Sequence, residues 1–150
     1  MRTSLKFATL ILLSMTGLYS GNASARDDHL MFPLSDALEN SETKGVLDKD
    51  VRLYFGAQKH PAIVTKHGQF RTNKKTNAFN KGDKTACEWA FASAIKSLQE
   101  RAVQEGGNAV VNIRSNYKNQ VVSSESDYMC GAGAFAAGVA FIGDVVTLKK

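Results

Sequence analysis

The two cysteines are the residues whose chemistry the sequence specifies most clearly. Cys87 and Cys130 are the only cysteines, and no C-x-x-C motif is present. In an oxidising compartment such an even pair predicts one structural disulfide. That bond would close a loop of about 43 residues, for which the chain-entropy model gives about 4 kcal/mol of stabilisation. The alternative is a free Cys87 thiol near the start of a helix, acting as a nucleophile alone or with a histidine.

The three histidines do not match a metal-binding or catalytic pattern. His60 and His67 are seven residues apart, a spacing that no zinc signature has. His29 would be the fourth residue of a chain cleaved after Ala25, whereas an amino-terminal copper site uses the third. No Ser-His-Asp, G-x-S-x-G or H-E-x-x-H pattern is present. We therefore predict no catalytic residue, no metal and no cofactor, and keep a thiol- or His-dependent enzyme as the alternative.

Residues 66–84 form the most basic stretch of the chain. Asp83 is its only acid, and the asparagine and glycine residues between the cations are typical of turns. We interpret this stretch as a loop, either a solvated surface loop or a binding site for an anionic glycan or lipid surface. Five cations are the candidate anion-binding residues: Arg71, Lys74, Lys75, Lys81 and Lys84.

A stretch of glycine and alanine follows the second cysteine, at residues 131–138. Glycine-rich loops can hold phosphate groups, but here no Lys-Ser or Lys-Thr follows, so a P-loop is absent. Small residues also allow another part of the backbone or a side chain to approach closely. We expect a close approach of this kind, beside the predicted disulfide.

The amino-terminal segment, residues 1–25, has the pattern of a secretory signal peptide. Arg2 and Lys6 precede an apolar segment at residues 7–18, and Ala-Ser-Ala at 23–25 matches a cleavage site. The apolar segment is shorter than the ~20 residues of a membrane-spanning helix, so an uncleaved anchor is the less favoured alternative. Removal of Arg2 and Lys6 lowers the formal net charge from +5 to +3. We predict a periplasmic or secreted protein, and so small a charge does not indicate nucleic-acid binding.

The processed chain divides into an extension at residues 26–50 and a single domain at residues 51–150. In the extension, residues 33–39 predict a short helix capped by Ser35 or Asp36, and residues 41–50 predict a mobile connection. Alternation predicts a half-buried strand at residues 51–55. Weaker strands are expected at 62–65 and 69–72.

The clearest element is a helix at residues 85–105. Thr85 and Glu88 fit a capping box at its start, and Gly106-Gly107 fits its end. One helical face carries a continuous apolar stripe that should pack on a sheet. The stripe consists of Cys87, Phe91, Ala94, Ile95, Leu98 and Ala102.

Three strands are predicted after this helix. In the first, residues 109–117, alternation places Ala109, Val111, Ile113 and Tyr117 on one face, and residues 118–120 fit a hairpin tip. The second covers residues 122–130. The third, residues 139–148, is apolar on nearly both faces and is typical of a central strand. One long helix packed on a mostly antiparallel sheet is an α+β domain.

Five segments carry a resemblance to a known family. They are LYFGAQKHP at 53–61, RTNKKTNAFNK at 71–81, ACEWAFASAIKSLQERA at 86–102, GGNAVVNIRSNY at 106–117 and YMCGAGAFAAGVAFIGDVV at 128–146. With them, residues 51–148 resemble a family of small exported bacterial proteins of uncharacterised function, often labelled excinuclease ATPase subunit. That label does not suit this chain, which has no P-loop.

A more distant resemblance is to the YbjQ-like and RcsF-like folds. Its basis is an alanine-rich helix followed by Gly-x-Asn-Ala-Val at the entry to a strand, here within residues 102–110. RcsF-like proteins are envelope-stress sensors in which disulfides brace a small α+β domain. This chain has one cysteine pair and no cysteine directly after the apolar segment that could carry a lipid. The resemblance implies a fold and an envelope location, and no catalytic residues.

These observations predict a non-enzymatic exported domain that binds a partner or senses the state of the envelope. The partner would be an envelope or extracellular protein. Two alternatives remain: an enzyme that uses Cys87 or the His60–His67 region, and a polyanion-binding module that uses residues 66–84.

Overall fold

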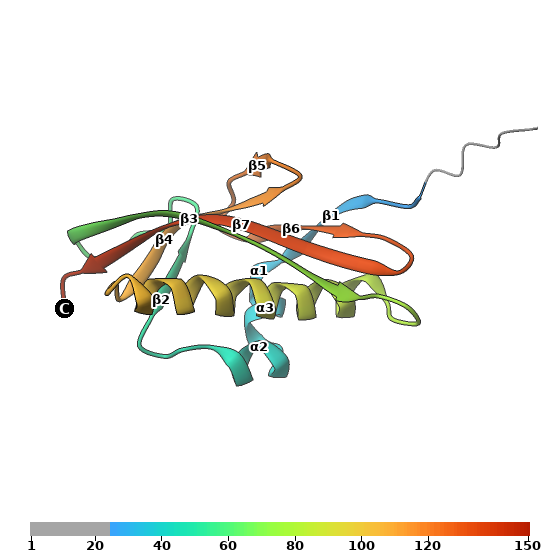
Figure 1. Ribbon diagram of the computed structural model, residues 1–150, viewed down its shortest axis with the longest axis horizontal. Helices are drawn as coiled ribbons and strands as arrows, with labels where there is room; N and C mark the ends of the chain where they lie inside the picture. The colour runs from blue at the N-terminus through green and yellow to red at the C-terminus, as the bar shows by residue number, and fades with distance from the viewer. Residues whose placement is uncertain (1–24) are drawn as a thin grey trace, which may run out of the picture.

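The computed structural model describes residues 25–150, so the predicted signal peptide lies outside the described residues except for Ala25. One long helix, α3 (Asp83–Gln104), runs along one face of a seven-stranded sheet (Figure 1). Two short helices, α1 (Leu34–Glu39) and α2 (Ser41–Val46), follow the first strand, and α2 packs against α3 on the side away from the sheet. The strands are β1 (Asp28–Pro33), β2 (Arg52–Phe55), β3 (Ile63–Asn77), β4 (Ala109–Tyr117), β5 (Gln120–Val122), β6 (Asp127–Ala132) and β7 (Ala136–Leu148). The predicted α+β class is confirmed.

The centre of the sheet is β7, as its apolar sequence predicts. One edge of β7 pairs with β3 along almost its whole length, from Ile63 opposite Leu148 to Asn77 opposite Ala136. The other edge pairs with β6 near the start of β7 and with β4 over the later part. β1 extends the sheet beyond β6, and β2 extends it beyond β4. Only the β2–β4 pair is parallel among the described strands, so the sheet is mostly antiparallel.

The prediction of a loop at residues 66–84 is wrong over most of that stretch. Residues 66–77 belong to β3, a 15-residue edge strand that joins the two weak strands predicted at 62–65 and 69–72. The strand forms because β7 supplies a partner for it, although lysine and asparagine have low strand propensity. The register shifts only between residues 63 and 68, where Gly68 has a φ of +130°. Only residues 78–82 form a turn.

The long helix is confirmed, but its predicted capping box is wrong. The helix begins two residues earlier than Thr85, with Gly82 at the N-cap and no side-chain cap. The Glu88 carboxylate instead accepts a hydrogen bond of 2.8 Å from the side-chain amide of Asn40. The end of the helix is as expected, because Gly106 adopts a positive φ of +79° and its N–H donates to the carbonyl of Val103.

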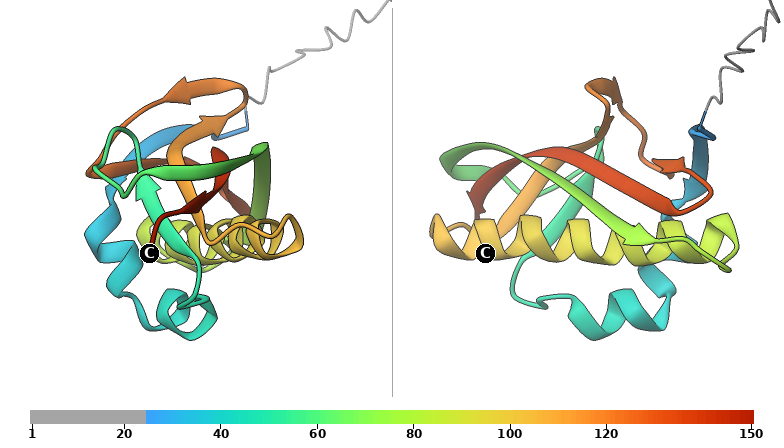
Figure 2. Two further views of the ribbon diagram at one scale, coloured as in Figure 1. Left: turned by 90° about the vertical axis from the view of Figure 1, so that its left-hand side faces the viewer. Right: turned by 45° about the vertical axis from the view of Figure 1, so that its right-hand side comes forward.

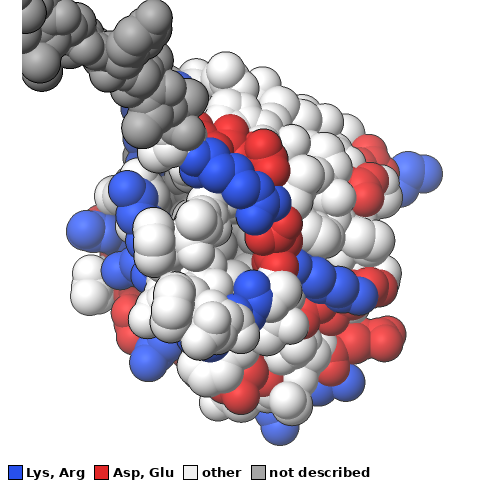
Figure 3. Space-filling model, turned by 90° about the vertical axis from the view of Figure 1, so that its right-hand side faces the viewer, with Lys and Arg blue, Asp and Glu red and all other residues white. Residues whose placement is uncertain are grey.

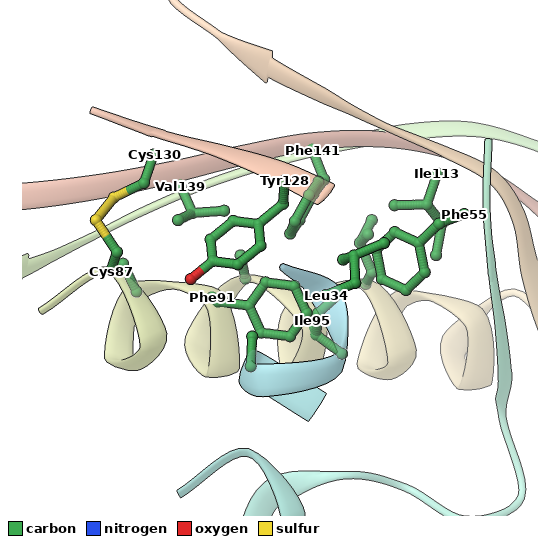
Figure 4. Packing of buried hydrophobic residues seen from close by; sticks show 14 of the residues in the cluster. Leu34, Phe55, Cys87, Phe91, Ile95, Ile113, Tyr128, Cys130, Val139 and Phe141 are labelled. Atoms are coloured by element: carbon green, nitrogen blue, oxygen red, sulfur yellow. A yellow bond between two sulfur atoms is a disulfide. The ribbon is translucent and has the colours of Figure 1, made fainter. Parts of the chain in front are cut away.

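Aromatic rings and the disulfide fill the space between α3 and the sheet (Figure 4). The Phe91 ring centroid on α3 lies 4.6 Å from that of Tyr128 on β6 and 5.6 Å from that of Phe141 on β7. At one end of this core Cys87 is bonded to Cys130, with Cα atoms 5.9 Å apart and both residues fully buried. The predicted disulfide is confirmed, and a buried disulfide fits a chain that folds in an oxidising compartment.

A bulge in β4 makes the predicted faces of that strand wrong. Asn112 has a φ of +52°, and the register with β7 shifts there. The extra residue changes the alternation, so Val110 and Ile113 both lie in the main core beside α3. Ala109 and Val111 pack in a small separate cluster on the other side of the sheet.

The hairpin after β4 is confirmed, whereas the single strand predicted at 122–130 is wrong. Lys118 and Asn119 have φ values of +49° and +63°, typical of a two-residue hairpin turn. β5 then ends at Val122 and β6 begins at Asp127. Between them the Ser124 hydroxyl accepts hydrogen bonds from the backbone N–H groups of Ser126 and Asp127, and these local bonds form a turn in place of a ladder.

The predicted helix near residue 33 is confirmed as α1, but Pro33 occupies its N-cap and neither Ser35 nor Asp36 caps it. The mobile connection predicted at 41–50 is wrong over residues 41–46, which form α2 against α3. The Asn40 side chain caps α2 by accepting a hydrogen bond from the backbone N–H of Glu42. Among residues 25–150, no helix is both long and apolar enough to cross a membrane.

Candidate anion-binding site

The sheet face opposite α3, here called the open face, is partly covered by the hairpin of β4 and β5 (Figure 2). Tyr117 at the end of β4 lies against Gly131 of β6 and Gly138 of β7, which are paired. A Cβ atom added to Gly131 would overlap the Tyr117 ring. The glycine-rich segment therefore allows a close approach beside the disulfide, as the sequence predicts.

Tyr117 also connects the hairpin to the first described residues. Its hydroxyl donates a hydrogen bond of 2.9 Å to the Asp27 carboxylate, and Lys118 forms an ion pair with the same carboxylate. The His29 ring meets the Tyr117 ring edge-on, with centroids 5.2 Å apart. The hydrogen bond from Lys118 lowers the pKa of Asp27, helped by the bond from Tyr117. This cluster holds the hairpin in place over the open face.

A hollow of about 270 Å³ lies beside this cluster, between β3 and the turn of the β4–β5 hairpin. Most of the side chains around it are amides or cations. We call it the amide hollow, and it is lined by Arg71, Thr72, Asn73, Asn116, Lys118, Asn119 and Ala140. Guanidinium, ammonium and amide N–H groups are all hydrogen-bond donors, so this set of side chains is suited to an anionic group.

The register between β3 and β7 determines which predicted cations share the open face. Arg71 lies opposite Ile142 and Lys75 opposite Gly138, and both side chains are on the open face. Lys74 lies opposite Val139, a core residue, so its side chain is on the face towards α3 and is half-buried.

The other two predicted cations lie outside the amide hollow. Lys81, in the turn after β3, donates from its ammonium group to the Asn77 carbonyl at 3.0 Å. Lys84, in the first turn of α3, pairs with Asp36 at 2.6 Å and lies 3.9 Å from Glu88. The Asp36 contact raises the pKa of Lys84. The five candidate cations therefore do not form one cluster. Only Arg71 lines the hollow, and Lys75 lies four residues further along β3 on the same face.

Sequence reasoning missed the side of the hollow that the hairpin provides. Asn116, Lys118 and Asn119 lie more than 40 positions from Arg71 in the sequence, and only the pairing of β3 and β4 with β7 brings them together. The Lys118-Asn119 turn was a usable signal, because a hairpin tip must project polar side chains from the sheet. Arg71 and Lys75 form no ion pair within residues 25–150, whereas the charge of Lys118 is offset by Asp27.

The histidines and cysteines lie away from the amide hollow and apart from one another. The His60 ring contacts the Pro61 carbonyl, and the His67 ring contacts the Thr147 hydroxyl at 2.8 Å. Within the described part of the chain, no group of three or more His, Cys, Asp or Glu residues could hold a metal ion. Cys87 and Cys130 are bonded to each other, so neither is a thiol while the bond holds.

Comparisons with known proteins identify no relative of this chain. No protein-family model, no curated protein and no solved structure matches it. A function is therefore inferred from the residues of the open face and from the sequence.

Proposed function

We propose that this protein is a non-enzymatic, exported domain of the bacterial envelope, periplasmic or secreted, that binds an anionic group in the amide hollow. The observation that supports this most directly is the placement of Arg71 and Asn73 across the hollow from Asn116 and Asn119. A guanidinium group matches the geometry of a phosphate or carboxylate with two parallel hydrogen bonds, and neighbouring amides donate further bonds.

The size of the hollow favours a small ligand group. At about 270 Å³ it is below the range of roughly 300–1,000 Å³ that sites for drug-sized molecules occupy. A phosphate or carboxylate attached to a sugar or a glycerol would fit, with the rest of the molecule outside. Such groups occur on lipid headgroups and on acidic glycans, both of which face an exported protein.

Export is supported by two features that are independent of the hollow. Residues 1–25 have a signal-peptide pattern, and the chain contains a buried disulfide. The sequence resemblance to YbjQ-like and RcsF-like proteins, carried by residues 102–110, implies an envelope role. We extend the proposal accordingly: binding in the hollow serves to detect a change in the envelope or to hold a partner there.

The test is a titration of the protein with three soluble probes, followed by backbone amide NMR shifts. The probes are inorganic phosphate, glycerol phosphate for a lipid headgroup, and glucuronate for an acidic glycan. We expect one of the two organic probes to shift the amides of residues 71–73 and 116–119, more weakly as salt is raised. Which probe binds identifies the source of the anion.

A matched pair of charge reversals separates a site from general attraction. Arg71→Glu with Lys75→Glu should abolish the shifts. Lys49→Glu with Lys59→Glu makes the same change in net charge at two exposed lysines outside the hollow, and should leave binding in place. Equal losses in the two variants, or no shift with any probe, would contradict the proposal.

A further inference from the structure

Two turns that are distant in the sequence meet at one end of the molecule and expose two phenylalanine rings. Phe79 lies in the turn between β3 and α3, and Phe135 lies in the turn between β6 and β7, which occupy the same end of the fold (Figure 1). The rings stack with centroids 6.1 Å apart and an interplanar angle of 10°. Phe79 is 56% exposed and Phe135 is 73% exposed, the highest value among the exposed large hydrophobic residues of the described chain. We call this pair and its two turns the aromatic tip.

The aromatic tip is held firmly by backbone contacts. The Ala78 N–H donates to the Phe135 carbonyl at 2.9 Å, which joins the two turns directly. Within the first turn, the Asn77 side chain accepts a hydrogen bond from the Phe79 N–H, and in the second the Gly133 N–H donates to the Ala136 carbonyl. The two rings are therefore exposed by the fold and not by a loose segment.

The first described residues lie against the same tip. A Cβ atom on Gly133 would be 3.0 Å from the Arg26 carbonyl oxygen, and residues 25–27 and 133–136 together line a hollow of about 270 Å³. The segment that precedes the described part, residues 1–24 with the apolar stretch at 7–18, therefore joins the fold at this end. If cleavage follows Ala25 as predicted, the new ammonium group of Arg26 adds a positive charge there.

The charge around the aromatic tip is net positive when the paired acids are counted. Four acids of this end are paired with cations, since Asp83 and Asp28 share Arg26, Asp36 binds Lys84 and Asp27 binds Lys118. Lys81 lies in the first turn, and Lys74 and Lys75 lie near the end of β3; none of the three has a carboxylate partner within residues 25–150. Figure 3, which faces this end, shows an uncharged area with Lys and Arg side chains around it and Asp and Glu side chains beside some of them.

We propose that the aromatic tip inserts into an anionic lipid surface, with Phe79 and Phe135 among the acyl chains and Lys81 at the headgroups. Aromatic rings next to basic side chains are the combination that binds the interface of anionic membranes. A second copy of the chain is a poorer occupant. Two phenylalanines bury about 150–250 Å² each, well below the roughly 800 Å² per partner of a stable interface. Two such tips would also bring their lysines together.

The first described residues, next to the tip, relate this surface to the processing of the chain. The predicted cleavage site after Ala25 therefore lies beside the tip, and in the processed protein attachment to a membrane depends on the two rings and the lysines. Attachment of this kind is weak and reversible, because it depends on two side chains and on charge. This inference does not depend on the amide hollow, since neither phenylalanine lines it.

The test is co-sedimentation of the protein, as its own cells process it, with lipid vesicles. Vesicles of phosphatidylethanolamine with phosphatidylglycerol should bind the protein at low salt, and vesicles of phosphatidylcholine should not. Phe79→Ser with Phe135→Ser should weaken binding by about tenfold or more, because two rings lose their apolar contact. Val64→Ser with Val121→Ser is the matched control, since these valines are 66% and 51% exposed and lie outside the tip. The control should bind like the unmodified protein.

A spectroscopic readout locates the contact independently of affinity. Phe135→Trp in a Trp89→Phe background leaves one tryptophan, at the tip. Its fluorescence emission should shift to the blue when the protein binds the anionic vesicles, and brominated acyl chains should quench it. Circular dichroism should show all variants folded. The proposal is overturned if the unmodified protein does not sediment with anionic vesicles, or if the phenylalanine variant binds as well as the valine control. It is also overturned if the phenylalanine variant loses a concentration-dependent dimer and the valine control does not, because the tip is then an interface between copies.

Discussion

The two faces of the sheet are built on different principles. The face towards α3, here called the covered face, is filled by closely packed rings from a helix and two strands, with Phe91, Tyr128 and Phe141 in mutual tilted or edge-on contact. On the open face, one large ring, that of Tyr117, lies over the paired glycines Gly131 and Gly138. Cations and amides lie beside it. Burial of apolar area therefore stabilises the fold mainly from one side, which leaves the other side free to carry polar groups.

The largest expected effect of a single substitution is on the covered face. Phe91→Ala removes a fully buried ring that contacts Tyr128, Phe141 and Phe55, and should lower the free energy of unfolding by about 3–5 kcal/mol. Urea denaturation followed by circular dichroism measures this. If Phe91→Ala lowers the free energy of unfolding by less than an open-face substitution does, the two faces do not differ in their contribution to stability as described.

Removal of the disulfide is expected to be nearly as costly. Cys87→Ala with Cys130→Ala frees the second turn of α3 from β6, and should lower stability by about 2–5 kcal/mol. Anion binding on the open face should persist below the new melting temperature, because neither cysteine lines the hollow. Reduction of the unmodified protein should give the same loss. Two titratable thiols in protein purified without reductant would contradict the assignment.

A smaller effect is expected where the open face is most closely packed. Gly131→Ala places a methyl group against the Tyr117 ring and should cost about 1–3 kcal/mol by forcing that ring to move. Gly45→Ala is the control, since a Cβ there has no atom within 4 Å and alanine favours the helix. Adding Tyr117→Ser should make the Gly131→Ala cost smaller, and fully additive losses would show that the ring is not the cause.

The Tyr128 hydroxyl is a buried polar atom on the covered face. It is buried with no hydrogen-bond partner within residues 25–150, so Tyr128→Phe should be neutral or slightly stabilising near pH 7. Burial raises the pKa of Tyr128, with Glu88 and Asp36 adding to the shift.

The sign of the resulting pH dependence follows from that raised pKa. The folded state keeps the proton of Tyr128 after the unfolded state has lost it, so this contribution is complete below the ordinary tyrosine pKa of about 10 and is lost as pH rises further. Urea denaturation across alkaline pH should show a shallower decline for Tyr128→Phe than for the unmodified protein. Parallel declines would show that another group is responsible.

The smallest effect on stability is expected from the cations of the open face. Arg71→Glu with Lys75→Glu should change the free energy of unfolding by no more than about 0.5 kcal/mol, because both side chains are exposed. The same variant is expected to lose the proposed anion binding. Measuring both properties on one preparation separates binding from stability, and a large drop in melting temperature would show that the two faces are not independent.

Those parts of the fold that depend on local patterns could be predicted from the sequence. The apolar stripe through Phe91 and Ile95 indicates α3, Gly106 marks its end, and the polar Lys118-Asn119 pair marks a hairpin tip. The disulfide could be predicted because Cys87 and Cys130 have no other partner.

The parts that depend on distant contacts could not be predicted. The sequence of β3 resembles a polar loop because its ladder partner is β7, at least 59 positions away, and Asn112 gives no sign that it will form a bulge. The amide hollow depends on both, since β3 places Arg71 and the hairpin places Asn119. The candidate cations were recognised, but their division between two faces follows from a register that only pairing defines.

β7 follows β3, β4 and β6 in the sequence and lies at the centre of the sheet, and this sets an order of events during synthesis. β3, β4 and β6 all pair with β7, and β6 carries Cys130, which is bonded to Cys87 of α3. A ribosome that has reached Phe135 has produced strands whose shared neighbour does not yet exist, because β7 begins at Ala136. The nascent chain therefore cannot complete its sheet until β7 has been made. An unfolded chain is also the form that a translocation channel threads.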